Sequence, residues 1–265
     1  MLQFGMPTLI ELDDLEDAMK LCNELGLSFV ELNMNLPQYQ TGCLEDTGYL
    51  ELMKEKYQIG YTIHLDENLN ISDFNRSVAE AYTDTVVRTI RAARILEVPI
   101  LNMHMNHGVH FTLPDRKVQL FEQYFEDYME SWRSFRKICE EELESSDLKI
   151  CIENTDGYRG YERAAIEYLL QSDAFGLTWD IGHSHSAGNI DEAFLMSHAD
   201  RLCHFHIHDG LGERDHMTLG TGEIDLVQRL GTAEKCQCRC VVETKTVEAL
   251  KASVSWLKNN KVVRF

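Results

Sequence analysis

Histidines at alternate positions mark one short segment of the chain. His204, His206 and His208 stand in the sequence CHFHIHDG, with Phe205 and Ile207 between them. Successive side chains of a β-strand point to opposite faces. As a strand, this segment would carry three imidazole rings on one face and apolar side chains on the other. Imidazole binds metal ions and transfers protons near neutral pH, so the segment is a candidate for either chemistry.

Ionisable residues also end most of the apolar runs in the chain. These residues are Glu31, His64, His104, Glu153, Asp180, His206 with His208, and Glu243. A single buried charge is costly, but several become tolerable when they share a cation or share protons. Carboxylate and imidazole groups without thiolates suit Mn²⁺, Mg²⁺, Co²⁺ or Zn²⁺. If the fold gathers these run ends, the sequence predicts a divalent-metal site.

The elements that would position these residues are eight short apolar runs in alternation with helical patterns. The runs are 2–6, 27–32, 59–65, 99–105, 148–153, 175–180, 202–208 and 239–243. The helical patterns include 14–25, 74–96, 118–143 and 161–170. This alternation predicts a single (β/α)₈ TIM barrel over residues 1–265, in which the carboxyl ends of all strands meet at one mouth. The alternative is an open doubly wound sheet, against which no GxGxxG opens the first helix.

Composition restricts the class of partner. The 265 residues are 44% hydrophobic and carry a formal net charge of −19, which attracts divalent cations and repels nucleic-acid phosphates. No run reaches the roughly 20 apolar residues of a membrane span, and the N-terminal residues lack a signal-peptide pattern. The eight cysteines include no CxxC pair, and KCQCRC is interpreted as packing thiols. We therefore expect a cytoplasmic protein without a nucleic-acid or membrane partner.

Five motifs together resemble the xylose isomerase-like barrel superfamily, which includes sugar isomerases and epimerases as well as the abasic-site repair enzyme endonuclease IV. They are ENT (153–155), WDIGHSHSAG (179–188), HIHDG (206–210), HMTLGTGEID (216–225) and VVETK (241–245). In the isomerase and epimerase branch, the resemblance implies one divalent metal held by Glu153, Asp180, His206 and Glu243. It also implies that the two glutamates exchange protons with substrate carbons and that His183 contacts a substrate oxygen.

The endonuclease IV branch implies three zinc ions and extra histidine ligands. The matching positions here are His64, His104, His183 and His216. One position departs from that pattern, because Arg214 stands where the repair enzyme has an aspartate, and Asp215 directly adjoins His216. Neighbouring residues of an extended segment point in opposite directions, so Asp215 is expected to point away. The segment LDENLN that contains Leu65 is acidic and lacks an aromatic wedge for bending DNA.

These observations predict a metal-dependent isomerase or epimerase of a sugar or sugar phosphate. Glu153 and Glu243 would transfer the proton, while a divalent metal, Mn²⁺ before Zn²⁺, Mg²⁺ or Co²⁺, would stabilise the enediolate. The expected substrate-binding residues are His64, His104, His183, His208 and Arg214. His204, deeper in the strand, would be a hydrogen-bonded core residue.

Two alternatives remain open. One is an endonuclease IV-like zinc phosphodiesterase with two or more Zn²⁺ ions, and the other is a degenerate barrel that acts as a binding protein. An oligomer is compatible with the aromatic residues of 121–135, although packing against the barrel would explain them equally well.

Overall fold

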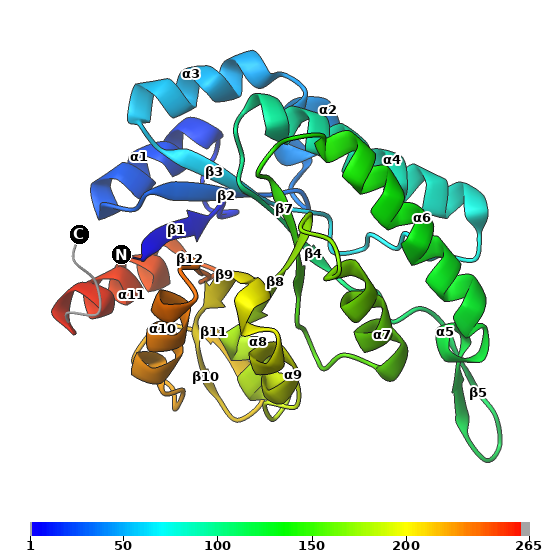
Figure 1. Ribbon diagram of the computed structural model, residues 1–265. Coiled ribbons are helices and arrows are strands. Elements are labelled where there is room, and N and C mark those ends of the chain that lie inside the picture. Colours follow the sequence, from blue (N-terminus) through cyan, green and yellow to red (C-terminus); the bar gives the residue numbers. More distant parts are fainter. Residues whose placement is uncertain (1, 261–265) are drawn as a thin grey trace.

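Eight parallel strands form a closed ring in the computed structural model, which describes residues 2–260 (Figure 1). The strands are β1 Gln3–Pro7, β2 Phe29–Asn33, β3 Gly60–His64, β4 Ile100–His104, β7 Lys149–Glu153, β8 Phe175–Asp180, β9 Leu202–Ile207 and β12 Arg239–Val242. Each strand pairs with the next, and β1 pairs with both β2 and β12. The prediction of a (β/α)₈ barrel is therefore confirmed. The alternative prediction, an open doubly wound sheet, is wrong because the ring has no free edge.

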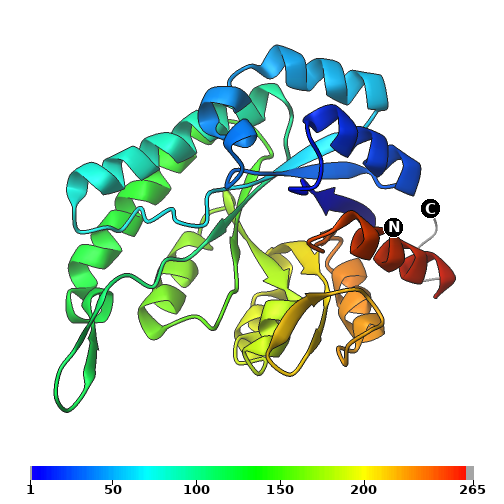
Figure 2. The ribbon, with the colours of Figure 1, turned by 180° about the vertical axis from the view of Figure 1, so that it is seen from behind.

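Helices surround this ring in both views (Figures 1 and 2). The longer helices are α1 Leu15–Leu25, α3 Thr47–Tyr57, α4 Arg76–Ile95, α6 Phe125–Leu143, α7 Gly160–Leu169, α10 Leu226–Lys235 and α11 Val247–Asn259. The short ones are α2 Thr41–Leu44, α5 Leu120–Gln123, α8 Ile181–Ser186 and α9 Glu192–Ser197, with 3₁₀ turns η1 Pro37–Tyr39 and η2 Ala199–Arg201. Two hairpins complete the fold, β5 His110–Thr112 with β6 Lys117–Gln119, and β10 Asp209–Leu211 with β11 Arg214–Met217.

Local sequence signals account for the first helix. The side chain of Asp14 accepts a hydrogen bond of 2.9 Å from the backbone N–H of Asp17, which caps the N-terminus of α1. Gly26 ends the same helix with φ 73°, a left-handed conformation that glycine adopts without a steric penalty. The helical patterns at 74–96 and 161–170 likewise become α4 and α7, with shifts of one or two residues.

The helix expected over 118–143 begins later than the sequence pattern suggests. Val118 pairs with Phe111 in the β5–β6 hairpin, so the chain is still extended at this point. Tyr124, with φ −114° and ψ 51°, then separates the short α5 from α6. Several aromatic side chains of the segment pack on the barrel: Phe121, Tyr128, Trp132 and Phe135 are buried. Packing within one chain thus explains much of this aromatic pattern, and the oligomeric state stays a prediction.

The inside of the barrel is polar near its carboxyl end. Side chains alternate along each strand, so Ile150 and Ile152 of β7 pack under the helices while Glu153 belongs to the opposite set. The pairing register places His104 beside Glu153 and Asp180 beside His206. Polar side chains from separate strands therefore meet at one depth.

The helices and the cysteines bear on membrane spans, disulfides and thiolate metal ligands, in turn. In the part of the chain from residue 2 to 260, no helix is both long and apolar enough to cross a membrane. All eight cysteines are free, and none belongs to a candidate metal-binding group of the described residues. Their interpretation as packing thiols agrees with the burial of Cys238 and Cys240.

Candidate metal centre

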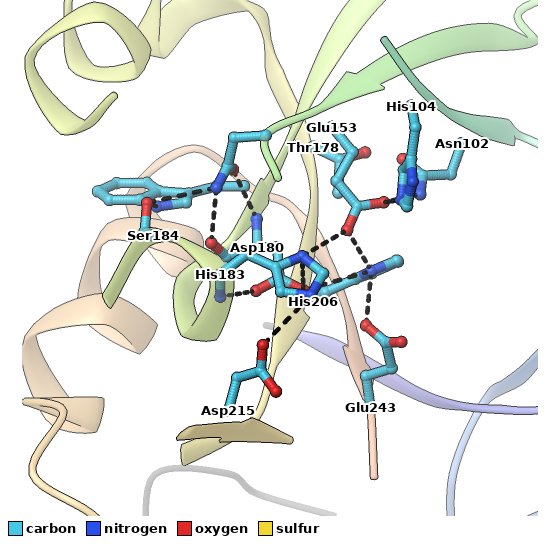
Figure 3. A network of polar contacts seen from close by, with 12 residues as sticks. Asn102, His104, Glu153, Thr178, Asp180, His183, Ser184, His206, Asp215 and Glu243 are labelled. Atoms are coloured by element: carbon cyan, nitrogen blue, oxygen red, sulfur yellow. Dashed lines mark hydrogen bonds and ion pairs between the residues drawn. The ribbon is translucent and has the colours of Figure 1, made fainter. Parts of the chain in front are cut away.

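The barrel brings together the four residues that the motifs single out as metal ligands. Glu153 ends β7, Asp180 ends β8, His206 lies in β9, and Glu243 directly follows β12. One donor atom from each lies within 4.8 Å of the others. Figure 3 shows these side chains pointing toward a common centre. Residues up to 90 positions apart in sequence (153 to 243) thus form one cluster.

The surroundings of one ring nitrogen indicate a cation site. Nδ1 of His206 lies 2.9 Å from Oε2 of Glu243, 3.1 Å from Oε1 of Glu153 and 3.8 Å from Oδ2 of Asp180. A ring nitrogen carries at most one proton, so it cannot donate to three carboxylates at once. Among the described residues, Oε2 of Glu243 has no aligned hydrogen-bond partner. A divalent cation would satisfy all four groups, so the residues present fit a metal ion.

The charges of the cluster shift the pKa values of its members in opposite directions. Burial disfavours the charged form of Glu153, but the positive charges of His206 and His104 outweigh burial and hold the pKa of this carboxyl well below its usual range. Burial also opposes protonation of His206, whereas Glu153, Glu31 and Glu243 raise the pKa of its ring well above the ordinary value. Despite burial, nearby histidines also lower the pKa values of the Asp180 and Glu243 carboxyls, so the ionised form of all three carboxyl groups is favoured.

Two further groups of histidines flank this centre. His104 and His64 face Glu153, with Nε2 atoms 3.1 Å and 3.4 Å from its Oε2. On the other side, His183, His208 and His216 form a second group whose ligand atoms also lie within 4.8 Å of one another. The four histidines noted for the endonuclease IV branch are therefore all placed around the centre.

Asp215 does not point away, and the expectation that it would is wrong. Its Oδ1 lies 2.9 Å from Nδ1 of His216. Its Oδ2 lies 3.8 Å from Nε2 of His183, a contact that Figure 3 shows. The reason is the backbone of His216, whose φ of 50° departs from an extended conformation. Side chains on either side of this residue therefore do not alternate strictly between the two faces of the strand. The flanking group therefore includes a carboxylate that the sequence pattern concealed.

Two other histidines and one arginine near the centre differ in their exposure to solvent. His208, expected at the substrate pocket, is fully buried behind Asp180, and its Nε2 lies 3.0 Å from Oδ1 of that residue. His204 is a buried core residue, as expected, and its Nδ1 lies 3.3 Å from Oγ1 of Thr178. Arg214 is exposed on β11, where its backbone pairs with Leu211, and its side chain has no hydrogen bond or ion pair among the described residues.

Three residues that support the site received no role from the sequence. The side-chain amide of Asn102 donates to Oε2 of Glu153, and its position two residues before His104 on β4 was the available signal. Asn154 accepts from the backbone N–H of Asp180 at 2.9 Å and donates to its carbonyl at 3.0 Å. Asp209 accepts from four backbone N–H groups, those of Gly210, Gly220, Gly222 and Ile224.

Gly182 of the DIGH motif leaves room for His208, and replacing it tests the packing behind Asp180. A β-carbon at Gly182 would lie 1.9 Å from Cε1 of His208, whose ring is held by Asp180 and by the N–H of His216 at 2.7 Å. We expect Gly182→Ala to lower the free energy of unfolding by about 1–3 kcal/mol and to weaken metal binding.

Thermal unfolding and metal titration measure these two effects. The matched control is Gly231→Ala in α10, where an added β-carbon meets nothing within 4 Å and helix propensity favours alanine. A Gly182→Ala protein as stable as the parent would contradict the tight packing of His208.

The fold and the cluster define a class of protein, a (β/α)₈ barrel with a candidate divalent-metal centre at the carboxyl ends of its strands. Residues 19–260 match the family described as xylose isomerase-like TIM barrel, and the chain belongs to this family.

Similar proteins extend over nearly the whole chain. An uncharacterized protein of Methanocaldococcus jannaschii, MJ1614, is 26% identical over 97% of this chain and 98% of its own. Among solved structures, a D-tagatose 3-epimerase-like protein has a TM-score of 0.78 at 22% identity, covering 99% of this chain and 100% of its own. The 3-keto-D-glucoside 4-epimerase YcjR from E. coli has a TM-score of 0.76 at 13% identity, covering 98% of this chain and 100% of its own. At these levels of sequence identity, the structural similarity shows a shared fold and nothing further.

Proposed function

We propose that the protein is a divalent-metal-dependent isomerase or epimerase of a sugar or sugar phosphate. The observation that carries this proposal is the convergence of two glutamates, one aspartate and one histidine on a single centre. The names of the two similar structures, a D-tagatose 3-epimerase-like protein and a 3-keto-D-glucoside 4-epimerase, support the same class of substrate. The acidic character of the chain also favours cation binding.

Glu153, Asp180, His206 and Glu243 would hold the metal. When bound, a divalent cation would supply Lewis-acid stabilisation of negative charge on substrate oxygens. Glu153 and Glu243 come from strands on different sides of the centre, β7 and the end of β12. One carboxylate would remove the proton next to a carbonyl group, and the same or the other carboxylate would return it.

The exposed part of the cluster suggests where a sugar would enter. Glu153, Asp180 and His206 are buried, whereas the side chain of Glu243 is 12% exposed. His104, His183 and His216 also reach solvent, with side-chain exposures of 15%, 20% and 16%. These imidazoles could donate hydrogen bonds to sugar hydroxyl or carbonyl oxygens. The substrate would therefore contact Glu243 before it reached Glu153.

The decisive experiment uses purified protein loaded with Mn²⁺ and then incubated in D₂O with ketoses and their phosphates. NMR would detect deuterium at the carbon beside the carbonyl group and any epimer or isomer formed. We expect exchange with at least one sugar and no exchange after chelation of the metal. Absence of exchange across such a panel, with metal bound, would count against the proposal.

A second candidate function is supported by the flanking histidine groups. His64 and His104 together with Glu153 could hold another ion, and so could His183, His208 and His216, with Asp215 nearby. Such an arrangement suits a zinc phosphodiesterase of the endonuclease IV type, which would activate water for attack on phosphate.

Counting the bound metal separates the two candidates. We expect one divalent ion per chain by mass spectrometry of metal-replete protein, and no nicking of DNA that contains an abasic site. Two or more zinc ions per chain together with nicking would favour the phosphodiesterase.

A further inference from the structure

We propose that Glu31 is a positioning residue that orients the ring of His206 toward the metal centre. Glu31 lies in β2, on the opposite side of His206 from the three carboxylates that face Nδ1. The inference rests on the metal centre of the proposed function and is independent of its substrate and reaction.

The contact between Glu31 and His206 lies in the interior of the barrel. Oε1 of Glu31 is 2.9 Å from Nε2 of His206, and both side chains are excluded from solvent. Nε2 of His206 has no aligned hydrogen bond among the described residues, so its contact with Glu31 is an ion-pair contact defined by distance. The other ring nitrogen, Nδ1, faces Glu153, Asp180 and Glu243.

Neighbouring side chains hold the Glu31 carboxylate in place. The hydroxyl of Thr62, on β3, donates a hydrogen bond of 2.9 Å to Oε2 of Glu31. Nε2 of His204 lies 3.4 Å from the same oxygen, and Nδ1 of that ring lies near Thr178. Residues of β3 and β9 therefore hold Oε2 of Glu31, which leaves its Oε1 directed at His206.

This arrangement determines which nitrogen of His206 can bind a metal. A carboxylate beside Nε2 favours a proton on that nitrogen, which leaves the lone pair of Nδ1 free for the ion. A carboxylate partner also orients the ring and increases its basicity as a ligand, and loss of such a partner typically weakens metal binding by about 10–100-fold. Glu31 would thus act on the metal through His206 without touching it.

A different role for the same residues is a direct ligand set. Glu31, His204 and His206 offer ligand atoms within 4.8 Å of one another, all buried. In that arrangement the three residues would hold an ion of their own, and removing Glu31 would remove one ion from the chain. The number of bound ions therefore distinguishes a ligand from a positioning residue.

The experiment measures Mn²⁺ affinity and ion count for full-length variants. We expect Glu31→Gln to bind the same number of ions as the parent with a Kd raised roughly 10–100-fold. The matched control is Glu162→Gln, another buried glutamate, whose contacts are to His107 at 2.6 Å and to the N–H of Arg159 at 2.7 Å. This control should unfold at a lower temperature and keep the parent Kd.

A second variant serves if Glu31→Gln does not fold. Thr62→Val retains the shape of the side chain and removes the hydroxyl that holds Glu31. We expect it to raise the Kd roughly two- to tenfold, less than Glu31→Gln, because it loosens Glu31 without removing its carboxylate. In Zn²⁺-loaded protein, the Nε2 proton of His206 should give a slowly exchanging NMR signal that these variants shift and Glu162→Gln leaves unchanged.

An unchanged Kd in a folded Glu31→Gln protein would overturn the proposal, as would an unchanged Kd in Thr62→Val where only that variant folds. One ion fewer per chain in Glu31→Gln would also overturn it, because Glu31 would then be a ligand. Neither result depends on sugar turnover, so a protein inactive on every sugar could still show the expected change in metal affinity.

Discussion

Replacing Glu153 or Glu243 with glutamine is expected to reduce exchange of the substrate's alpha hydrogen with solvent deuterium by about 10²–10⁴-fold. Glutamine has nearly the shape of glutamate but cannot accept the proton. Both carboxylates face the same nitrogen of His206, at 3.1 Å and 2.9 Å, so either can reach a carbon placed at this centre. NMR in D₂O at saturating Mn²⁺ measures the exchange, because each substitution also weakens metal binding.

Circular dichroism and metal titration provide the controls for these variants. Glu162→Gln, which changes a buried glutamate held by His107 and Arg159, should retain exchange at the parent rate. Full exchange in both Glu153→Gln and Glu243→Gln would remove the two glutamates from the proton transfer. Loss in only one variant would assign the transfer to that residue alone.

Removing the divalent metal is expected to lower the melting temperature by roughly 5–10 °C at a metal concentration about 100 times the Kd. A ligand that binds the folded state alone stabilises it by about 2.7 kcal/mol under this condition. The physical reason here is the proximity of Glu153, Asp180 and Glu243, whose negative charges lose a shared counter-ion when the metal leaves. Thermal unfolding with and without EDTA measures the shift.

Asp180→Asn tests whether the shift comes from this centre. Asp180 is fully buried and faces Nδ1 of His206 at 3.8 Å, so its loss should remove most of the response to added Mn²⁺. A distant change such as Gly231→Ala should leave the response intact. A parent protein whose melting temperature ignores both Mn²⁺ and Zn²⁺ would instead favour a degenerate barrel that serves as a binding protein.

Much of the fold and of the candidate centre followed from patterns in the sequence. Apolar runs in alternation with helical patterns predicted the eight strands and the barrel, because strand and helix periods are local properties of the chain. Polar residues at run ends then predicted a group of ionisable side chains that includes these four ligand candidates (Glu153, Asp180, His206 and Glu243), since the carboxyl ends of parallel strands share one mouth. The resemblance to the family selected these four from the larger group and implied their roles as ligands.

Other features depended on contacts between distant segments. The burial of His208 depends on its packing against Gly182 and Asp180. The direction of Asp215 depends on the left-handed backbone of His216, which no local pattern announced. The side-chain period of a strand gives the face on which His208 lies but not what covers it, and for Asp215 the period fails because the chain leaves extended geometry at His216.

The sequence by itself determined which strand-end residues gather at the mouth of the barrel, because the periods of strands and helices are local properties and their alternation predicts the barrel. Only the tertiary structure decided which of them touch. The 2.9 Å contact of Glu31 with His206 and the contact of Asn102 with Glu153 arise from the stagger of strands around a closed ring. That stagger depends on how all eight strands pair at once, so no single segment encodes it.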